Sequence, residues 1–398
     1  MRRRALSAAL CLCLLIVAFL SVTFTAHAEE AGLEEVEKQL EESVSEELDA
    51  IDFSELEEWA RQYGANSTFG STVKEAVRAV LNGETSFEPE EFSGLIVNAV
   101  TGGIVNALPA FAAIFAVAVM MSMMQGLSSG FLRDNTREIV HFACYAAIIA
   151  ILAVQITSVI MQVRETVEGM NKLMQAVFPV LLAMMTALGS ASAAGAFSPM
   201  MALLSSGIGA LIAQIVLPCF IATVVLSVVG NMSEGIKLGR LSKFFKSAAT
   251  FVLAGAFSLF AVFLTVQGLA GGIADSVSLK AAKFAVQSYV PVLGGYLSDG
   301  LDLALAGIVL IKNSLGLVCV IMLCTAVLVP IVQTAVLTLG LKLTAGLCEP
   351  ICKDKRVSDL LFGVSKNTGL LIAALAGMAF MFIMVVMLVI ATCNAGVI

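Results

Sequence analysis

The sequence predicts an all-α fold, a polytopic helical membrane protein with six to ten spans. Of its 398 residues, 59% are hydrophobic and 13% are charged, and the mean hydropathy is +0.95, whereas soluble domains are about half apolar. Several apolar runs also reach the length of about 20 residues that a helix needs to cross a bilayer. Runs of glycine and alanine, at 189–196 and 373–377, favour close packing between membrane helices.

The amino terminus predicts a signal peptide over residues 1–28. Arginines at positions 2–4 precede an apolar core at 6–20, and Ala26 and Ala28 supply the small residues of a cleavage site after Ala28. An uncleaved anchor helix is the alternative, although the core is short for a membrane span. Cleavage would leave the mature amino terminus outside the cytoplasm.

The next segment, residues 29–94, is predicted to be an acidic helical ectodomain. Between positions 29 and 92 the chain carries 19 acidic and four basic residues. Apolar residues recur at three- and four-residue spacing, which indicates amphipathic helices. Two interpretations stay open: a solvated helix pair near the membrane, or a docking surface for a partner helix. The apolar positions are Leu33, Val36, Leu40, Val44, Leu48 and Ile51, then Val73, Val77, Val80 and Leu81.

An internal repeat organises the membrane part. Identical residues recur at a constant separation of 112 positions, which predicts two membrane repeats, over 166–272 and 273–398, after a first helical hairpin over 95–165. The pairs include Gln175 and Gln287, Pro179 and Pro291, Gly195 and Gly307, Leu203 and Leu315, Leu211 and Leu323, and Pro218 and Pro330.

Basic residues mark three loops, each following an apolar helix. Positively charged loops stay in the cytoplasm, so all three loops should face one side and separate the arms of three helical hairpins with six crossings. The second and third loops are also candidates for docking a cytoplasmic partner. The basic residues are Arg133 and Arg137 in the first loop, Lys237, Arg240, Lys243 and Lys246 in the second, and Lys353, Lys355, Arg356 and Lys366 in the third.

Between the hairpins lie two apolar stretches, 173–206 and 284–318, each interrupted near its middle. The interruptions are at 189–195 in the first, and at Gly294-Gly295 and 298–300 in the second. Two short spanning helices or a re-entrant pair of half-helices would satisfy the topology equally, hence the range of six to ten spans. Broken helices at matching positions are where transporters and channels place their pathways.

A lysine and an asparagine, Lys312 and Asn313, lie inside the second of these stretches. Hydrocarbon penalises both side chains, so they should face protein or water. One interpretation is a polar lining of a pathway or a contact to a partner helix. The other is an interfacial loop that holds Lys312 at the water boundary near Asp299 or Asp302. The candidate residues are Lys312, Asn313, Asp299, Asp302, Gly294 and Gly295.

Four glutamines lie within or near the apolar spans, at Gln155, Gln214, Gln267 and Gln333. Side-chain amides in membrane helices form hydrogen bonds between helices. These glutamines are therefore predicted to fix helix packing.

The order of four motifs resembles the stage III sporulation protein AE family of endospore-forming bacteria. The resemblance implies a membrane component of the apparatus that joins the mother cell to the engulfed forespore, placed in the mother-cell membrane around the forespore. It also implies stage III sporulation partners: an ATPase facing the basic loops and ring-forming subunits near the acidic region. The motifs are Leu279-x-x-Ala282-Lys283-Phe284, Pro291-Val292-x-Gly294, the aspartates Asp299 and Asp302, and Leu310-Ile311-Lys312-Asn313.

No catalytic motif is found in the sequence. A phosphate-binding loop, a His-Glu-x-x-His zinc motif, a Gly-x-Ser-x-Gly elbow and a pair of intramembrane aspartates are all missing. We therefore expect no enzyme activity, no cofactor, no catalytic or metal site and no nucleic-acid partner. Two functions remain: a membrane subunit of a multiprotein secretion or channel complex, and a stand-alone secondary transporter or permease for a small solute. A cleaved signal and an acidic ectodomain are rare in stand-alone transporters, which favours the first.

Overall fold

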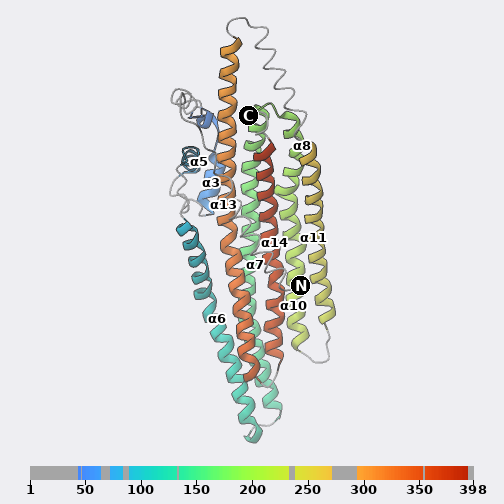
Figure 1. Cartoon of the computed structure of the whole chain (residues 1–398). Helices are drawn as coiled ribbons and strands as arrows, with labels where there is room; N and C mark the ends of the chain where they lie inside the picture. The colour runs from blue at the N-terminus through green and yellow to red at the C-terminus, as the bar shows by residue number, and fades with distance from the viewer. Residues whose placement is uncertain are drawn as a thin grey trace.

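The computed structural model is an elongated bundle of long helices (Figure 1). It describes residues 44–45, 47–63, 72–83, 89–131, 134–232, 238–270, 294–352 and 355–392. Within these ranges the chain is almost entirely helical and has no strand, which confirms the all-α prediction. The predicted signal peptide and its cleavage point at Ala28 lie outside the described residues.

The described helices fall into two short amino-terminal helices and a set of long ones. Residues 191–232 form one helical run in which two π-helical segments alternate with α-helix. The α-helices are α3 (Ser54–Gln62), α5 (Val73–Leu81), α6 (Pro89–Phe131), α7 (Asp134–Ala187), α8 (Ala191–Ala202), α9 (Gly209–Leu211), α10 (Leu217–Met232), α11 (Gly239–Ala270), α13 (Gly294–Ile351) and α14 (Arg356–Thr392), and the π-helices are η1 (Leu203–Ile208) and η2 (Ile212–Val216).

Six helical segments of the described chain are long and apolar enough to cross a membrane. They are Ser93–Met124, Phe142–Ala187, Ala191–Asn231, Gly239–Thr265, Ala304–Ile351 and Arg356–Ala391. They pair in chain order into three hairpins, α6 with α7, the α8–α10 run with α11, and α13 with α14, whose connecting turns lie toward one end of the bundle (Figure 1). This confirms the predicted helical membrane class, and the six segments correspond to the six helices of the three predicted hairpins.

Several helices are longer than a bilayer requires. Helix α13 has 58 residues, and at a rise of about 1.5 Å per residue it spans about 87 Å. The hydrocarbon core of a bilayer is only about 30 Å thick. The bundle therefore extends well beyond the membrane.

The first interrupted stretch is a tight turn between long helices. Gly189 has a φ of 77°, which glycine adopts without a steric penalty. The Gly189 amide donates to the Thr186 carbonyl and the Ser190 amide to the Met185 carbonyl, both at 3.0 Å, which is the Schellman ending of a helix. Helix resumes at Ala191, so the interruption is shorter than the sequence suggested.

The second interrupted stretch is only partly described. Helix α13 starts at Gly294 and runs unbroken through 298–300, so the break expected there is not present. Residues 284–293 lie outside the described part. The helix continues through these positions because its backbone hydrogen bonds do not depend on the side chains, and a glycine or an aspartate inside a helix costs only about 1 kcal/mol.

The bundle core is closed by direct contacts between hairpins. The Phe111 ring of α6 lies against the backbone of Gly340 in α13, and the Phe257 ring of α11 lies against Gly377 in α14. A small residue at each contact lets an aromatic ring approach the neighbouring helix closely. In contrast, large apolar side chains point outward from α6 and α11, among them Val105, Leu108, Phe251 and Leu259, as expected of a lipid-facing surface.

Candidate functional site

Lys312 lies inside the bundle on an unbroken helix. Its side chain is fully buried, and Nζ donates to the carbonyl of Ile390 at 3.1 Å and to that of Val389 at 3.5 Å. These carbonyls belong to the last turn of α14, where backbone acceptors have no partner within the helix and the helix dipole favours a cation. Lys312 thus donates hydrogen bonds to backbone carbonyls at the end of the neighbouring helix α14. The sequence did not predict this partner.

The other candidate pathway residues do not gather around Lys312. Asp302 and Asp299 precede it by 10 and 13 positions on the continuous helix α13, which separates the backbones by about 15–20 Å. The interfacial loop that was expected to bring Lys312 near an aspartate is therefore not found. Gly294, Gly295, Asp299 and Asp302 lie in the first turns of α13, where only the backbone is described.

Asn313, the neighbour of Lys312, occupies a partly buried position. Its Oδ1 atom is buried and has no hydrogen-bond partner among the described residues. An unsatisfied amide oxygen in an apolar interior costs about 1–3 kcal/mol.

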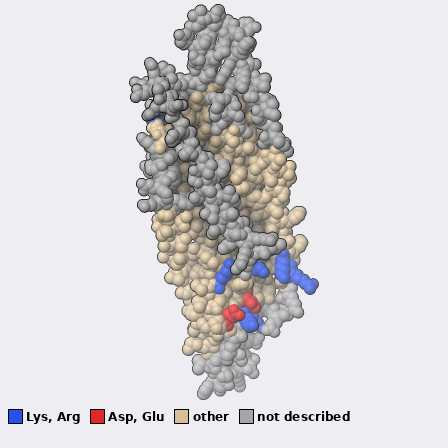
Figure 2. Space-filling view, viewed as in Figure 1, with Lys and Arg blue, Asp and Glu red and all other residues tan. Residues whose placement is uncertain are grey.

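Basic side chains gather toward the hairpin-turn end of the bundle, with some acidic side chains among them (Figure 2). Arg240 and Lys243 at the start of α11 and Lys355 just before α14 are exposed. Lys246 instead links two hairpins, since its Nζ donates to the carbonyl of Lys366 at 2.7 Å and to Asn367 Oδ1 at 3.1 Å. Arg356 begins α14 and is half-buried. Lys237 and Lys353 lie outside the described residues.

Polar side chains join the long helices at several levels. Gln162 of α7 donates to Gln333 of α13, which confirms the predicted interhelical role for Gln333. The hydroxyls of Thr338 in α13 and Thr368 in α14 lie 2.7 Å apart. Gln214, by contrast, is exposed. Each interhelical hydrogen bond stabilises a membrane bundle by about 0.6 kcal/mol, so these contacts set register more than overall stability.

The run that contains the two π-helical segments packs beside α7 and α11. Gln175 Nε2 donates to the Ser205 carbonyl of η1 at 3.4 Å, and the amide of Asn171 lies against Gly209, between η1 and η2. Pro218 follows η2 and cannot donate to the carbonyl four residues earlier. Missing and shifted backbone hydrogen bonds of this kind accompany π-helical turns. Periodicity could not locate these segments, because hydropathy along the run is uniformly high.

The short amino-terminal helices pack on the bundle. Trp59 of α3 is buried, and its Nε1 donates to the carbonyl of Gly169 in α7 at 2.7 Å. The Tyr63 ring stacks on Trp59 at a centroid distance of 5.1 Å and contacts Gly169. Val44 and Leu48 from the predicted apolar stripe are also buried. The described part of this stripe therefore packs within the chain, against the expectation of a solvated pair or a surface left for a partner.

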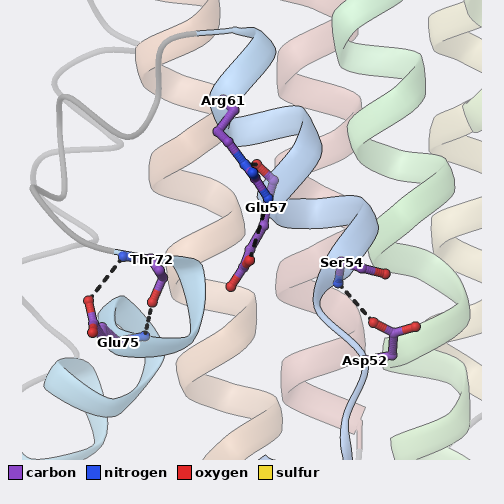
Figure 3. A network of polar contacts seen from close by, with 6 residues as sticks. All are labelled: Asp52, Ser54, Glu57, Arg61, Thr72 and Glu75. Atoms are coloured by element: carbon purple, nitrogen blue, oxygen red, sulfur yellow. Dashed lines mark hydrogen bonds and ion pairs between the residues drawn. The ribbon is translucent and has the colours of Figure 1, made fainter.

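Local polar contacts fix the ends of these helices (Figure 3). Asp52 accepts from the Ser54 amide at 2.9 Å before α3, and hydrogen bonding to the Ser54 side chain and amide lowers the pKa of Asp52. Thr72 and Glu75 form a reciprocal capping box at the start of α5. Glu57 and Arg61 form an ion pair at 3.8 Å along α3. Each contact is local, so it sets helix ends without determining where the helices dock.

Two carboxylates near α5 have shifted pKa values for opposite reasons. Lys74 lies 2.7 Å from Asp49, and its hydrogen bond and charge, with that of Arg78 at 3.6 Å, lower the pKa of Asp49. Partial burial raises the pKa of Glu47, whose Oε2 lies close to Gly307 of α13. Ionisation therefore strengthens the first contact and weakens the second.

Among the described residues, no cluster of three or more histidine, cysteine, aspartate or glutamate side chains could hold a metal ion. The interior of the described bundle is instead apolar, with interhelical hydrogen bonds and one capping lysine. Together with six long apolar helices, this arrangement defines a polytopic helical membrane protein built from three hairpins.

The model of the stage III sporulation protein AE family matches residues 71–393, and the chain belongs to this family. It is 25% identical over 321 residues to stage III sporulation protein AE of Bacillus subtilis (strain 168), which covers 81% of this chain and 80% of that protein. No solved structure matches the chain. The family membership confirms the resemblance seen in the sequence motifs. Helix α3 with Trp59 precedes the matched region.

Proposed function

We propose that this sporulation membrane protein is a subunit of a multiprotein secretion or channel complex that links mother cell and forespore. The observation that carries the proposal is the distribution of charge along the bundle. Arg240, Lys243 and Lys355 are exposed at the hairpin-turn end, whereas the amino-terminal helices, which carry more acidic than basic residues, pack farther along the bundle, on α7 and α13 (Figure 1). A protein polarised in this way presents two different surfaces to partners.

The positive-inside rule assigns sides to these surfaces. The basic hairpin ends would face the mother-cell cytoplasm, where an ATPase could dock on Arg240, Lys243 and Lys355. The acidic amino-terminal helices would lie between the two membranes, near ring-forming subunits. The chain itself would have no enzyme activity or cofactor, so energy would come from a partner.

The interior packing favours a structural role for a single chain. Leu315, Met322 and Leu341 of α13 are fully buried, as are Leu371 and Phe382 of α14, and the two helices pack against each other. Lys312 is directed at the end of α14. A conduit would therefore lie between subunits of the complex, with Asn313 and the start of α13 as candidate contacts.

Charge reversal at the third basic loop tests the proposal. Replacing Lys353, Lys355 and Arg356 by glutamate should abolish co-purification with the cytoplasmic ATPase partner and block sporulation. The matched control is Arg164→Glu, a reversal at an exposed position in the middle of α7. A cysteine probe at Gly239, on a cysteine-free background, reports whether the basic end still faces the cytoplasm. Normal co-purification and normal spores with unchanged topology would remove the docking role.

The alternative is a stand-alone secondary transporter. The parallel orientation of the two repeats favours this alternative. The first helical arms of the second and third hairpins, which contain residues 195–218 and 307–330, run in the same direction along the bundle (Figure 1). Transport of a small solute by the purified chain in liposomes, without any partner protein, would support this alternative. Transport only with co-expressed partners would support the complex.

A further inference from the structure

A cavity lies where the amino-terminal helices meet the bundle. Its volume is about 550 Å³; it is partly open to the surface and is lined by α3 with Tyr63, by α7 between positions 162 and 172, and by α13 between 325 and 330. This size is within the range of about 300–1,000 Å³ typical of small-molecule sites.

The polar groups around the cavity have largely used their donors inside the protein. Trp59 Nε1 donates to Gly169, and Gln162 Nε2 donates to Gln333. The Thr166 hydroxyl donates to the Gln162 carbonyl at 2.7 Å, and the Thr325 hydroxyl donates to carbonyls of its own helix. Hydroxyl and amide oxygens keep free lone pairs after donating. These groups therefore present acceptors to the cavity.

Charge adds to this preference. Of the three charged side chains that line the cavity, Glu165 and Glu168 are acidic and Lys172 is basic. Lys172 lies 4.0 Å from Glu168, which leaves the negative charge of Glu165 without a counter-charge from the lining. The stacked rings of Trp59 and Tyr63 add π faces, which attract cations. The cavity combines acceptors, a net negative charge and aromatic rings.

The cavity also lies at a change in the surface of α7. Met161 and Val154, on the side toward the hairpin turn, are exposed large apolar residues, as at a lipid-facing surface. Arg164, Glu165 and Glu168 follow and are exposed charged residues. This change from apolar to charged surface is where lipid headgroups meet a membrane protein.

We propose that this cavity binds a protonated primary alkyl amine. The ammonium group would donate to Glu165, Glu168 and the Thr325 hydroxyl, and its alkyl chain would pack against Trp59 and the apolar face of α13. Two sources supply this chemistry: a small soluble amine, or the ethanolamine headgroup of a phospholipid. The ligand would join α3 to α7 and α13, whether or not the chain acts in the complex proposed above.

The chain provides its own reporter, because Trp59 is its one tryptophan. The full-length protein in detergent micelles is titrated with butylamine, and Trp59 fluorescence is recorded at neutral pH. The expected result is a saturable change that butanol, which has the same chain without the charge, does not produce. No saturable change, or equal changes with amine and alcohol, would overturn the proposal.

Two variants separate specific binding from a general charge effect. Replacing both Glu165 and Glu168 by glutamine should weaken butylamine binding by about tenfold or more, as expected for hydrogen bonds to charged groups. Replacing both Glu55 and Glu58 by glutamine, which removes two negative charges from α3 outside the cavity lining, should change it less than twofold. An unchanged emission maximum without ligand verifies that α3 remains docked. Equal affinities for all three proteins would refute the assignment.

Nanodiscs distinguish the two sources. Phosphatidylcholine carries a headgroup without N–H donors, so protein in these discs should respond to added butylamine as it does in micelles. If an ethanolamine headgroup is the ligand, discs with phosphatidylethanolamine should show the shifted emission from the start and need about tenfold more butylamine for a further change. If the response is the same in both discs, the ligand is a soluble amine. A response to butylamine in neither disc contradicts the proposal.

Discussion

The contact between Gly340 and Phe111 allows a quantitative test of how the hairpins pack. A Cβ atom added at Gly340 would lie 2.0 Å from Phe111 Cε2 and 2.4 Å from Cζ, whereas carbon atoms in contact are about 3.5–4.0 Å apart. Gly340→Ala therefore forces the ring, or helix α6 that carries it, to move by more than 1 Å. Overpacking of this kind costs about 1–3 kcal/mol.

Gly346→Ala is the matched control on the same helix. A Cβ atom there meets nothing within 4 Å, so only the helix preference of alanine acts, which stabilises by about 0.5–1 kcal/mol. Both variants gain this stabilisation, but only Gly340→Ala is destabilised by the steric overlap with Phe111. The two variants should therefore differ in free energy of unfolding by about 1–3 kcal/mol.

Equilibrium unfolding of the full-length protein by titration of detergent micelles with SDS, followed by circular dichroism, measures this difference. Phe111→Leu should relieve most of the strain in the Gly340→Ala protein, and the double-mutant cycle isolates the coupling between the two positions. Equal stabilities for the two alanine variants, or no coupling to Phe111, would show that the hairpins do not pack as described.

The amino-terminal helices provide three further predictions, each followed by Trp59 or protease accessibility. Trp59→Phe removes the hydrogen bond to Gly169 and should weaken docking of α3 by about 1–2 kcal/mol, seen as faster proteolysis near α3. Burial raises the pKa of Glu47 in the folded chain. The contribution of Glu47 to docking stability is therefore favourable at low pH and is lost as pH rises through that pKa. Glu47→Gln should therefore stabilise docking at neutral pH, measured by Trp59 emission against temperature. Lys74 lowers the pKa of Asp49 in the folded chain, so the contribution of Asp49 to docking stability is present at neutral pH and is lost as pH falls through that lowered pKa. Asp49→Asn should therefore remove this loss of docking from an acid titration followed by Trp59 emission.

The sequence by itself determined the membrane class and the order of the hairpins. A bilayer demands helices that satisfy their own backbone and places positive loops on one side, so apolar length and charge indicate three hairpins, within a total of six to ten spans, without knowledge of any contact. The motifs around Lys283 and Lys312 likewise indicated the family. Gln333 was identifiable because an amide in an apolar span needs a partner.

The tertiary structure decided which groups meet. Lys312 contacts the carbonyl of Ile390, 78 positions away, and Trp59 contacts that of Gly169, 110 positions away. Hydropathy shows that a buried lysine needs an acceptor but not which helix end supplies it. The unbroken course of α13 past position 300 was also not evident from the sequence, since a glycine or aspartate inside a helix costs only about 1 kcal/mol, which is too little to end a helix. Burial of Leu48 against the chain itself depends in the same way on surfaces that only the folded bundle creates.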